Sequence, residues 1–311
     1  MASFDAYIEQ ARGKTGGWRI LVGLLIIAVF WILGTVVVLG LWVGTMMLQG
    51  MDRQSALGTL GTLEGGGSPP IMAVMLLTFI GVWVGILIVQ KALHGIRFRS
   101  IFAPDLRVHW FDFLKGVLLS LAFTVPGVLV ALTVTDAART DLDIGRWAVW
   151  LIPLIGLIFI QATAEELIFR GYLLQQLAVI SRSPVLWAGV PSILFGLMHF
   201  SPSLPDGGGY YYVLVTLLTG LTLALLVWRT GNLWAATGLH LATNVMGLTV
   251  IGADGVLTGT QIWLLPKDDI GALFQVDLIA SAVMLAFVAS PLGRIFGEAG
   301  REDPPEVQAF D

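Results

Sequence analysis

The chain has 311 residues, of which 56% are hydrophobic and 12% are charged, and its mean hydropathy is +0.85. This composition excludes an ordinary soluble globular protein and is typical of a polytopic α-helical membrane protein. The absence of cysteine excludes disulfides, thiolate zinc sites and cysteine nucleophiles. The formal net charge of −4 gives no indication of a nucleic-acid partner, and none is expected.

The first predicted element is a polar cytoplasmic segment over residues 1–17, which lacks the features of a cleavable signal peptide. Within it, residues 2–13 could form a short interfacial helix with Phe4, Tyr7 and Ile8 on one side, and a frayed terminus is the alternative.

Eight mostly apolar stretches follow, most of them long enough to cross about 30 Å of hydrocarbon. They cover residues 18–48, 71–90, 111–134, 147–179, 185–200, 211–228, 232–251 and 276–292. Residues 293–311 are polar and contain proline, so a disordered cytoplasmic tail is expected there. The sequence therefore predicts an all-α fold, a single bundle of about eight transmembrane helices over residues 18–292.

Orientation follows from the distribution of Lys and Arg, because cytoplasmic loops carry an excess of positive charge. With eight spans and both termini inside, only Arg53, Arg139, Arg146 and Lys267 of the 17 basic residues fall on the outer side. The sequence thus predicts a multi-pass integral membrane protein with cytoplasmic N- and C-termini.

Ionisable side chains inside the spans are few and costly at membrane depth, so each is a candidate functional residue. The sequence has no HExxH zinc helix and no G-x-S-x-G elbow. Every Asp falls at a predicted span edge or outside, which excludes two facing intramembrane aspartates. The polar groups that remain form three clusters: Glu165, Glu166 and Arg170; His199; and His240 with Asn244.

Helical spacing assigns faces to these residues, because side chains three or four positions apart share a face and direct neighbours diverge by about 100°. Glu166 and Arg170 are spaced to form an ion pair, while Glu165 points elsewhere and is the candidate for general acid and base catalysis. Two further pairs share a face in the same way: His240 with Asn244, and Phe195 with His199.

The three clusters are predicted to lie at comparable depth. They are roughly 14 to 21 Å from the cytoplasmic ends of their helices at about 1.5 Å per residue, provided that the fourth helix continues beyond Arg170. Each feature alone has a structural interpretation: a single His can be a packing residue, Glu166 and Arg170 a buried structural pair, and Phe195 a core residue. The functional hypothesis therefore depends on their co-occurrence.

The same clusters carry sequence motifs. EELIFR at 165–170 fits a Glu-Glu-x-x-x-Arg pattern, FGLMH at 195–199 a Phe-x-x-x-His pattern, and HLATN at 240–244 a His-x-x-x-Asn pattern. In this order and on apolar helices, they resemble the motifs of the CPBP family of intramembrane proteases, also called the CAAX-processing or Abi family. The resemblance covers about residues 150–250, and the remaining spans match only in general character.

The resemblance implies an endopeptidase that acts at or within the membrane, related to the enzymes that remove the last three residues of prenylated CAAX proteins. Transferred motif by motif, it implies that Glu165 activates the attacking water, with His199 helping to position it. It also implies that His240 and Asn244 stabilise the oxyanion. Arg170 could alternatively meet a substrate carboxylate. The supporting residues implied by the motifs are Glu166, Arg170 and Phe195.

Two interpretations of the chemistry stay open. Glu165, His199 and His240 could bind Zn²⁺ and leave a fourth position free, and members of the family have been labelled metalloproteases. A water activated by glutamate needs no metal, and this interpretation is favoured because Asn244 is a poor zinc ligand but a good oxyanion donor. No cofactor is required in that case, and Zn²⁺ is the alternative.

The expected partners are the lipid bilayer and a membrane-associated peptide or lipidated, CAAX-like protein as substrate, and a bacterial plasma membrane is preferred over a eukaryotic endomembrane. Two functions of other classes compete with proteolysis. One is a proton-coupled transporter that uses the Glu and His residues as a relay, although the sequence shows no paired halves. The other is a catalytically silent scaffold or immunity protein, against which the complete motifs argue.

Overall fold

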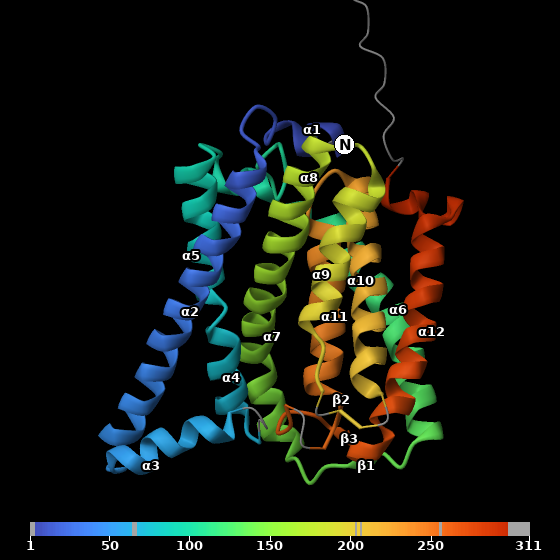
Figure 1. Ribbon diagram of the computed structural model, residues 1–311. Helices are drawn as coiled ribbons and strands as arrows, with labels where there is room; N and C mark the ends of the chain where they lie inside the picture. Colours follow the sequence, from blue (N-terminus) through green and yellow to red (C-terminus); the bar gives the residue numbers. More distant parts are fainter. Residues whose placement is uncertain (1–3, 64–66, 203, 206, 255–256, 298–311) are drawn as a thin grey trace, which may run out of the picture.

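The computed structural model describes residues 4–63, 67–202, 204–205, 207–254 and 257–297. Figure 1 shows long helices packed side by side, with α1 across one end and three short strands at the other. The α-helices are α1 (Phe4–Glu9), α2 (Gly17–Leu48), α3 (Arg53–Gly58), α4 (Pro69–Leu77), α5 (Ile80–Ile88), α6 (Trp110–Val134), α7 (Ile144–Glu166), α8 (Leu174–Ile180), α9 (Val190–Met198), α10 (Gly208–Thr230), α11 (Trp234–Thr249) and α12 (Ile270–Ala289).

Six helices of the described chain are long and apolar enough to cross a membrane, so the protein is a polytopic membrane bundle. They are Gly17–Leu48, Pro69–Leu93, Trp110–Val134, Ile144–Ile180, Gly208–Thr230 and Lys267–Ala289. The predicted count of eight is corrected, because the stretches at 185–200 and 232–251 form the shorter helices Val185–Met198 and α11. The first ends with His199 as its C-cap, and a turn at Gly231, with φ of 64°, delays the start of the second.

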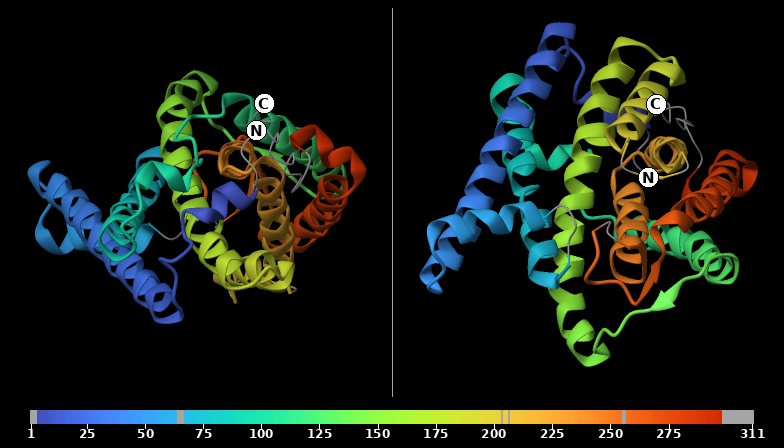
Figure 2. Two further views of the ribbon diagram at one scale, coloured as in Figure 1. Left: turned by 90° about the horizontal axis from the view of Figure 1, so that it is seen from above. Right: turned by 60° about the horizontal axis from the view of Figure 1, so that its bottom comes forward.

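The short helix α11 lies in the interior of the bundle. Seen from above in Figure 2, it stands between α6, α7 and α10, and residues 235–242 are all buried. Glycine permits its close approach to α6: a Cβ on Gly238 would lie 2.1 Å from the carbonyl oxygen of Phe113. Such contacts between small residues are a common way of packing helices in membranes, where van der Waals contact replaces the hydrophobic effect.

The helices α2 to α5 form a layer at one side of the bundle (Figures 1 and 2). Here α2 and α5 approach through Gly81, on which a Cβ would lie 2.3 Å from the carbonyl oxygen of Phe30. Trp83 joins the layer to α7 by donating to the carbonyl oxygen of Ile160 over 2.9 Å. Towards the far end of α2, nothing lies within 4 Å of a Cβ built on Gly40, and Trp42 donates to the Thr59 hydroxyl over 3.0 Å.

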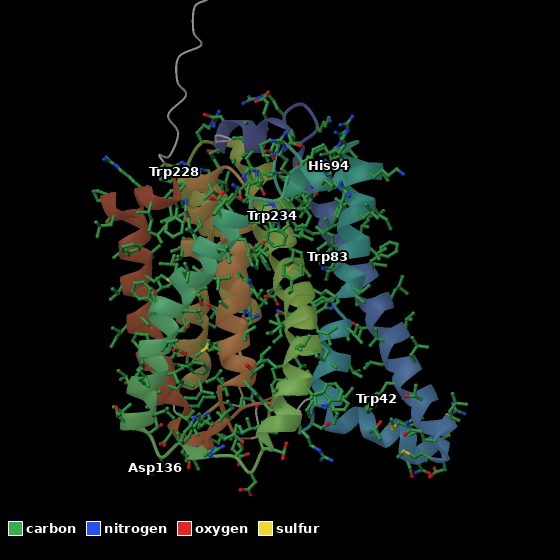
Figure 3. The ribbon with its side chains drawn as sticks, turned by 180° about the vertical axis from the view of Figure 1, so that it is seen from behind. Trp42, Trp83, His94, Asp136, Trp228 and Trp234 are labelled. Atoms are coloured by element: carbon green, nitrogen blue, oxygen red, sulfur yellow. The ribbon has the colours of Figure 1, made fainter. Side chains whose placement is uncertain are left out.

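The two ends of the bundle differ. At one end β3 (Trp263–Leu265) pairs antiparallel with β1 (Ala138–Arg139) and parallel with β2 (Ile251–Ala253). This small sheet is a departure from the predicted all-α fold. In Figure 3 Trp228 and Trp234 lie near the opposite end. Tryptophan is enriched where membrane helices meet the interface.

Helix α1 packs on the protein at the end opposite the sheet. Its Phe4, Tyr7 and Ile8 are buried, and the Tyr7 hydroxyl donates to the carbonyl oxygens of Ile101 (2.8 Å) and Arg170 (3.3 Å). Burial in the protein raises the pKa of Tyr7 well above its ordinary value, so the hydroxyl stays protonated as a donor. The predicted short helix is thus present, but it is docked on the bundle.

The start of the expected disordered tail is also helical. Residues 293–296 belong to a 3₁₀ segment, Pro291–Phe296, in which Phe296 is buried. Arg229 fixes the end of α12 before it by donating to the carbonyl oxygens of Val288 (2.8 Å) and Ser290 (2.9 Å). Residues 298–311, the remainder of the predicted tail, lie outside the described residues.

Candidate active site

One continuous helix, Ile144–Ile180, carries both glutamates and Arg170. It consists of α7, the π-helical segment η4 (Leu167–Leu173) and α8, so the helix does continue beyond Arg170. Segments of π-helix are rare and occur frequently at functional sites. In this chain the π-helical turn begins directly after Glu166.

Glu166 is the acceptor at the centre of the site. Its Oε1 accepts from Arg170 Nη1 over 2.9 Å, which is the ion pair that the spacing predicts, and also lies 2.7 Å from His240 Nδ1. All three side chains are at most 5% exposed. A buried carboxylate is stable only when it is paired and hydrogen-bonded, and Arg170 and His240 supply both kinds of contact.

Arg170 is enclosed from several sides. Its Cζ lies 4.5 Å from the centre of the Phe195 ring, a cation–π arrangement. The space for its guanidinium depends on Gly220 of α10, on which a Cβ would lie 2.9 Å from Arg170 Nη2. The Arg170 side chain is only 1% exposed, and its Nη1 is paired with Glu166.

Glu165 is the more accessible of the two carboxylates. Its side chain is 14% exposed, against 0% for Glu166, and its Oε2 lies 3.4 Å from His240 Nε2. His240 therefore stands between the carboxylates, with one ring nitrogen towards each. If the Nδ1 proton is donated to Glu166, the orientation of the ring is fixed and Nε2 faces Glu165 and the accessible side of the site.

His199 joins the site through aromatic contacts. It caps α9, and its Nδ1 lies 2.7 Å from the carbonyl oxygen of Phe195. The Phe195 ring packs against His199 at 4.6 Å and His240 at 5.7 Å between centroids. The other face of His199 meets the Tyr212 ring at 5.3 Å. The structure thus brings the second and third motifs together around Phe195, with His199 outside the direct contacts of the glutamates.

Asn244 is held by Gln161, a residue that sequence reasoning did not select. Asn244 Nδ2 donates to Gln161 Oε1 over 2.8 Å. Gln161 precedes Glu165 by four residues and Asn244 follows His240 by four, so the antiparallel helices α7 and α11 make two successive polar contacts. The available signal was a second polar side chain, one helical turn before Glu165, in an apolar helix.

Asp277 corrects another expectation. With a span predicted to begin at residue 276, this aspartate was placed at its edge, whereas the observed span Lys267–Ala289 puts it well inside. It faces α6, where its Oδ1 would lie 3.9 Å from a Cβ on Gly127. The boundary was missed because the first turns of α12 mix polar and small residues with apolar ones.

The possible zinc ligands do not converge. Within the described residues, no group of three or more His, Cys, Asp and Glu side chains could hold a metal ion. Glu165 and His240 are close enough to share an ion, but His199 is oriented by its own helix and packs on Phe195 and Tyr212. The arrangement therefore does not fit the three-ligand zinc site considered from the sequence.

Comparison with known proteins identifies related sequences. Residues 146–246 match the family model described as type II CAAX prenyl endopeptidase Rce1-like. The chain is also similar to the uncharacterized protein YyaK of Bacillus subtilis (strain 168), with 23% identity over 251 residues, which cover 78% of this chain and 80% of YyaK. The matched segment of this chain, residues 146–246, contains all three motifs and both residues of the contact between Gln161 and Asn244.

Proposed function

Residues 146–246 form an Rce1-like domain of the type II CAAX prenyl endopeptidase (CPBP) family, and on this premise we propose that the chain is an intramembrane endopeptidase. The observation that carries the proposal is the placement of His240 between Glu165 and Glu166 inside an apolar bundle. A chain that only needed to pack would not require two carboxylates around one buried imidazole, since buried ionisable groups are costly.

In the proposed reaction, the Glu165 carboxylate removes a proton from water as the water oxygen attacks the carbonyl carbon of the peptide bond. His199, whose Nδ1 is occupied by the Phe195 carbonyl, offers Nε2 to orient that water. The proton held by Glu165 then passes to the leaving amine as the tetrahedral intermediate collapses. Glu165 is suited to this role because it is the less buried of the two carboxylates and has no guanidinium partner.

The negatively charged oxygen of the tetrahedral intermediate is stabilised by hydrogen-bond donors. Asn244 has one amide hydrogen on Gln161 and a second available, and His240, when protonated on both nitrogens, donates to Glu166 through Nδ1 and to the oxyanion through Nε2. Donors held in place in this way are typically worth about 3–4 kcal/mol each in the transition state. Glu166 and Arg170 act as positioning residues for His240.

The proposed substrate is a membrane-associated or lipidated protein with a CAAX-like end, as the name of the matched family suggests. The proposed mechanism uses no metal, and removal of Zn²⁺ by a chelator tests this. We further propose a bacterial plasma membrane with both termini in the cytoplasm. Two observations support that orientation: both described ends lie at one end of the bundle, and most basic residues flank the same end.

The decisive experiment compares protein N- and C-termini in membranes of cells that contain either the wild-type chain or Glu165→Gln at equal abundance. Proteolysis predicts termini that arise only with the wild type and that are lost again with His199→Ala, and those termini identify the substrate. Identical termini in all three samples, with candidate substrates present, would reject the endopeptidase proposal. A solute-flux assay would then test the transporter alternative.

A further inference from the structure

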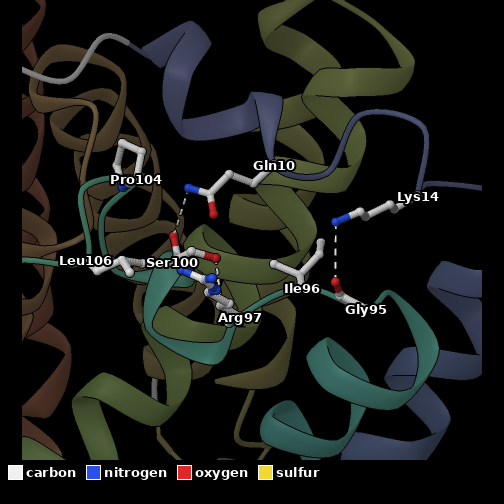
Figure 4. Close-up of a pocket in the computed structure, with 8 residues that line it drawn as sticks. All are labelled: Gln10, Lys14, Gly95, Ile96, Arg97, Ser100, Pro104 and Leu106. Atoms are coloured by element: carbon white, nitrogen blue, oxygen red, sulfur yellow. Dashed lines mark hydrogen bonds between the residues drawn. The ribbon is translucent and has the colours of Figure 1, made fainter.

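Two clefts are both lined by residues 95–97, just beyond the end of the span Pro69–Leu93. One has a volume of about 400 Å³ and the other about 600 Å³, and they share four lining residues: Gly95, Ile96, Arg97 and Leu106. Figure 4 shows the smaller cleft, bordered by Arg97 and Leu106 on the loop and by Gln10 and Lys14 from the N-terminal segment. Because residues 95–97 closely follow the membrane-spanning helix Pro69–Leu93, the clefts lie at the level where the helix leaves the hydrocarbon.

The larger cleft combines apolar and cationic side chains. Its apolar wall comes from Leu87, Phe98 and Leu106, and its cations are Lys91, Arg97 and Arg99. No Asp or Glu lines it. In the described part of the chain these three cationic side chains have neither an ion pair nor a hydrogen bond of their own.

The carboxylate nearest in sequence to the three cations, that of Asp105, already has hydrogen-bond partners within its own turn. Asp105 Oδ1 accepts from the backbone N–H of Arg107 and lies 3.1 Å from His109 Nε2. The backbone hydrogen bond and His109 lower the pKa of Asp105, which keeps its charge engaged within its own turn. The positive charge of the cleft is therefore left for a ligand.

Leu106 adds a conformational observation. It has φ of 62°, in the left-handed region that leucine rarely adopts, and its side chain is 38% exposed. This conformation keeps an apolar side chain in the wall of both clefts. Strained residues of this kind are concentrated at ligand sites, where the surrounding structure maintains them.

We propose that these clefts bind one anionic phospholipid. Lys91, Arg97 and Arg99 bind its phosphate, and an acyl chain lies along Leu87, Phe98 and Leu106. The polar part of the headgroup enters the smaller cleft beside Gln10 and Ser100. The occupant is a lipid and not a soluble anion, because the cations stand over an apolar wall at the end of a membrane span, a common arrangement in binding sites for anionic lipids.

The test uses the full-length protein purified in a neutral detergent and native mass spectrometry with lipids of identical acyl chains. Phosphatidylglycerol is compared with phosphatidylcholine, and glycerol 1-phosphate tests for a soluble anion. The site variant is Lys91→Gln, Arg97→Gln and Arg99→Gln together. The matched control is Arg12→Gln, Arg182→Gln and Arg294→Gln, which removes the same charge from exposed positions at the same end outside the clefts.

The wild type and the control should prefer phosphatidylglycerol by at least about tenfold, and the site variant should lose that preference. Leu106→Gly suits the positive φ, so it should fold and bind phosphatidylglycerol several-fold more weakly. Three results would each overturn the proposal: equal preference in site and control variants, unchanged binding by Leu106→Gly, or equally tight binding of glycerol 1-phosphate. Proteolysis is not measured, so the outcome is independent of the proposed function.

Discussion

Helices α2 and α11 reverse the usual relation between polarity and burial. The 32 residues of α2 include no Asp, Glu or His, yet only Ile20, Gly23 and Ile27 are buried. In contrast, α11 carries His240, Asn244 and several threonines in 16 residues, and its residues 235–242 are all buried. The most apolar of the long helices is thus the one that the protein covers least.

The contrast follows from the solvent. Lipid is as apolar as leucine, so an apolar helix loses nothing by facing it, whereas polar groups are stable in the membrane only against partners in the protein. Each polar side chain of α11 has such a partner: His240 has the two glutamates, Asn244 has Gln161, and Thr243 shares a 2.8 Å hydrogen bond with Ser120. In this bundle, the buried helix is therefore the one that carries the polar side chains of the candidate active site.

The largest expected effect separates the two glutamates that face α11. Glu165→Gln should lower cleavage of the substrate identified above by about 10²–10⁴-fold, the usual contribution of a general base, with little change in thermal stability. Glu166→Gln leaves Arg170 buried without its partner, so it should also destabilise the fold, by about 3–5 kcal/mol. Equal stability losses in the two variants would contradict the assignment of Glu165 as the accessible base.

The second prediction concerns the contact between Asn244 and Gln161. Asn244→Ala should reduce the cleavage rate constant by about 10²–10³-fold, as expected for loss of an oxyanion donor. Gln161→Ala should lower the cleavage rate constant by about tenfold, because the Asn244 amide remains but is no longer held in place. The double variant should be no slower than Asn244→Ala alone. Additive losses in single-turnover rates would show that Gln161 acts independently of Asn244.

A third prediction compares the same substitution in the two helices. Gly238→Ala in α11 places a Cβ 2.1 Å from the Phe113 carbonyl oxygen and should destabilise the protein by about 1–3 kcal/mol. Gly40→Ala in α2 meets nothing within 4 Å and should leave stability unchanged or slightly raised. Thermal unfolding in detergent measures both, and a larger loss for Gly40→Ala would invalidate the comparison.

The smallest expected effect is that of metal removal. Treatment with a zinc chelator should leave cleavage within about twofold of the untreated rate, and the purified protein should contain no stoichiometric zinc by elemental analysis. A loss of activity that Zn²⁺ restores would instead establish a metal enzyme and would require His199 to move towards Glu165 and His240.

Sequence reasoning identified what depends on local pattern. The span of α2 is evident because its apolar run is unbroken, and the Glu166–Arg170 pair follows from helical spacing alone. The length of α11 was overestimated because the turn at Gly231 depends on backbone conformation, which hydropathy does not report. Hydropathy also placed the start of the last span at residue 276, whereas α12 begins at Ile270. Asp277 was therefore expected at the edge of the span and lies inside it.

Contacts between distant segments were the part that could not be predicted. Gln161 gains its role from Asn244, 83 positions later, and Arg170 fits only because Gly220 lacks a side chain. Neither relation has a period or a spacing in the sequence. The motifs indicated that the three clusters would meet, but not that the Phe195 ring would pack against both His199 and His240.

The docking of α1 has a consequence for biogenesis. Tyr7 donates to the carbonyl oxygens of Ile101 and Arg170, and its helix packs against α8. Because ribosomes synthesise a chain from its N-terminus, α1 emerges before any part of its binding site exists. It must wait at the membrane surface until the helix Ile144–Ile180, the fourth of the six long spans, has been inserted. Helix α1 is thus translated before the first four long spans and docks only after the fourth.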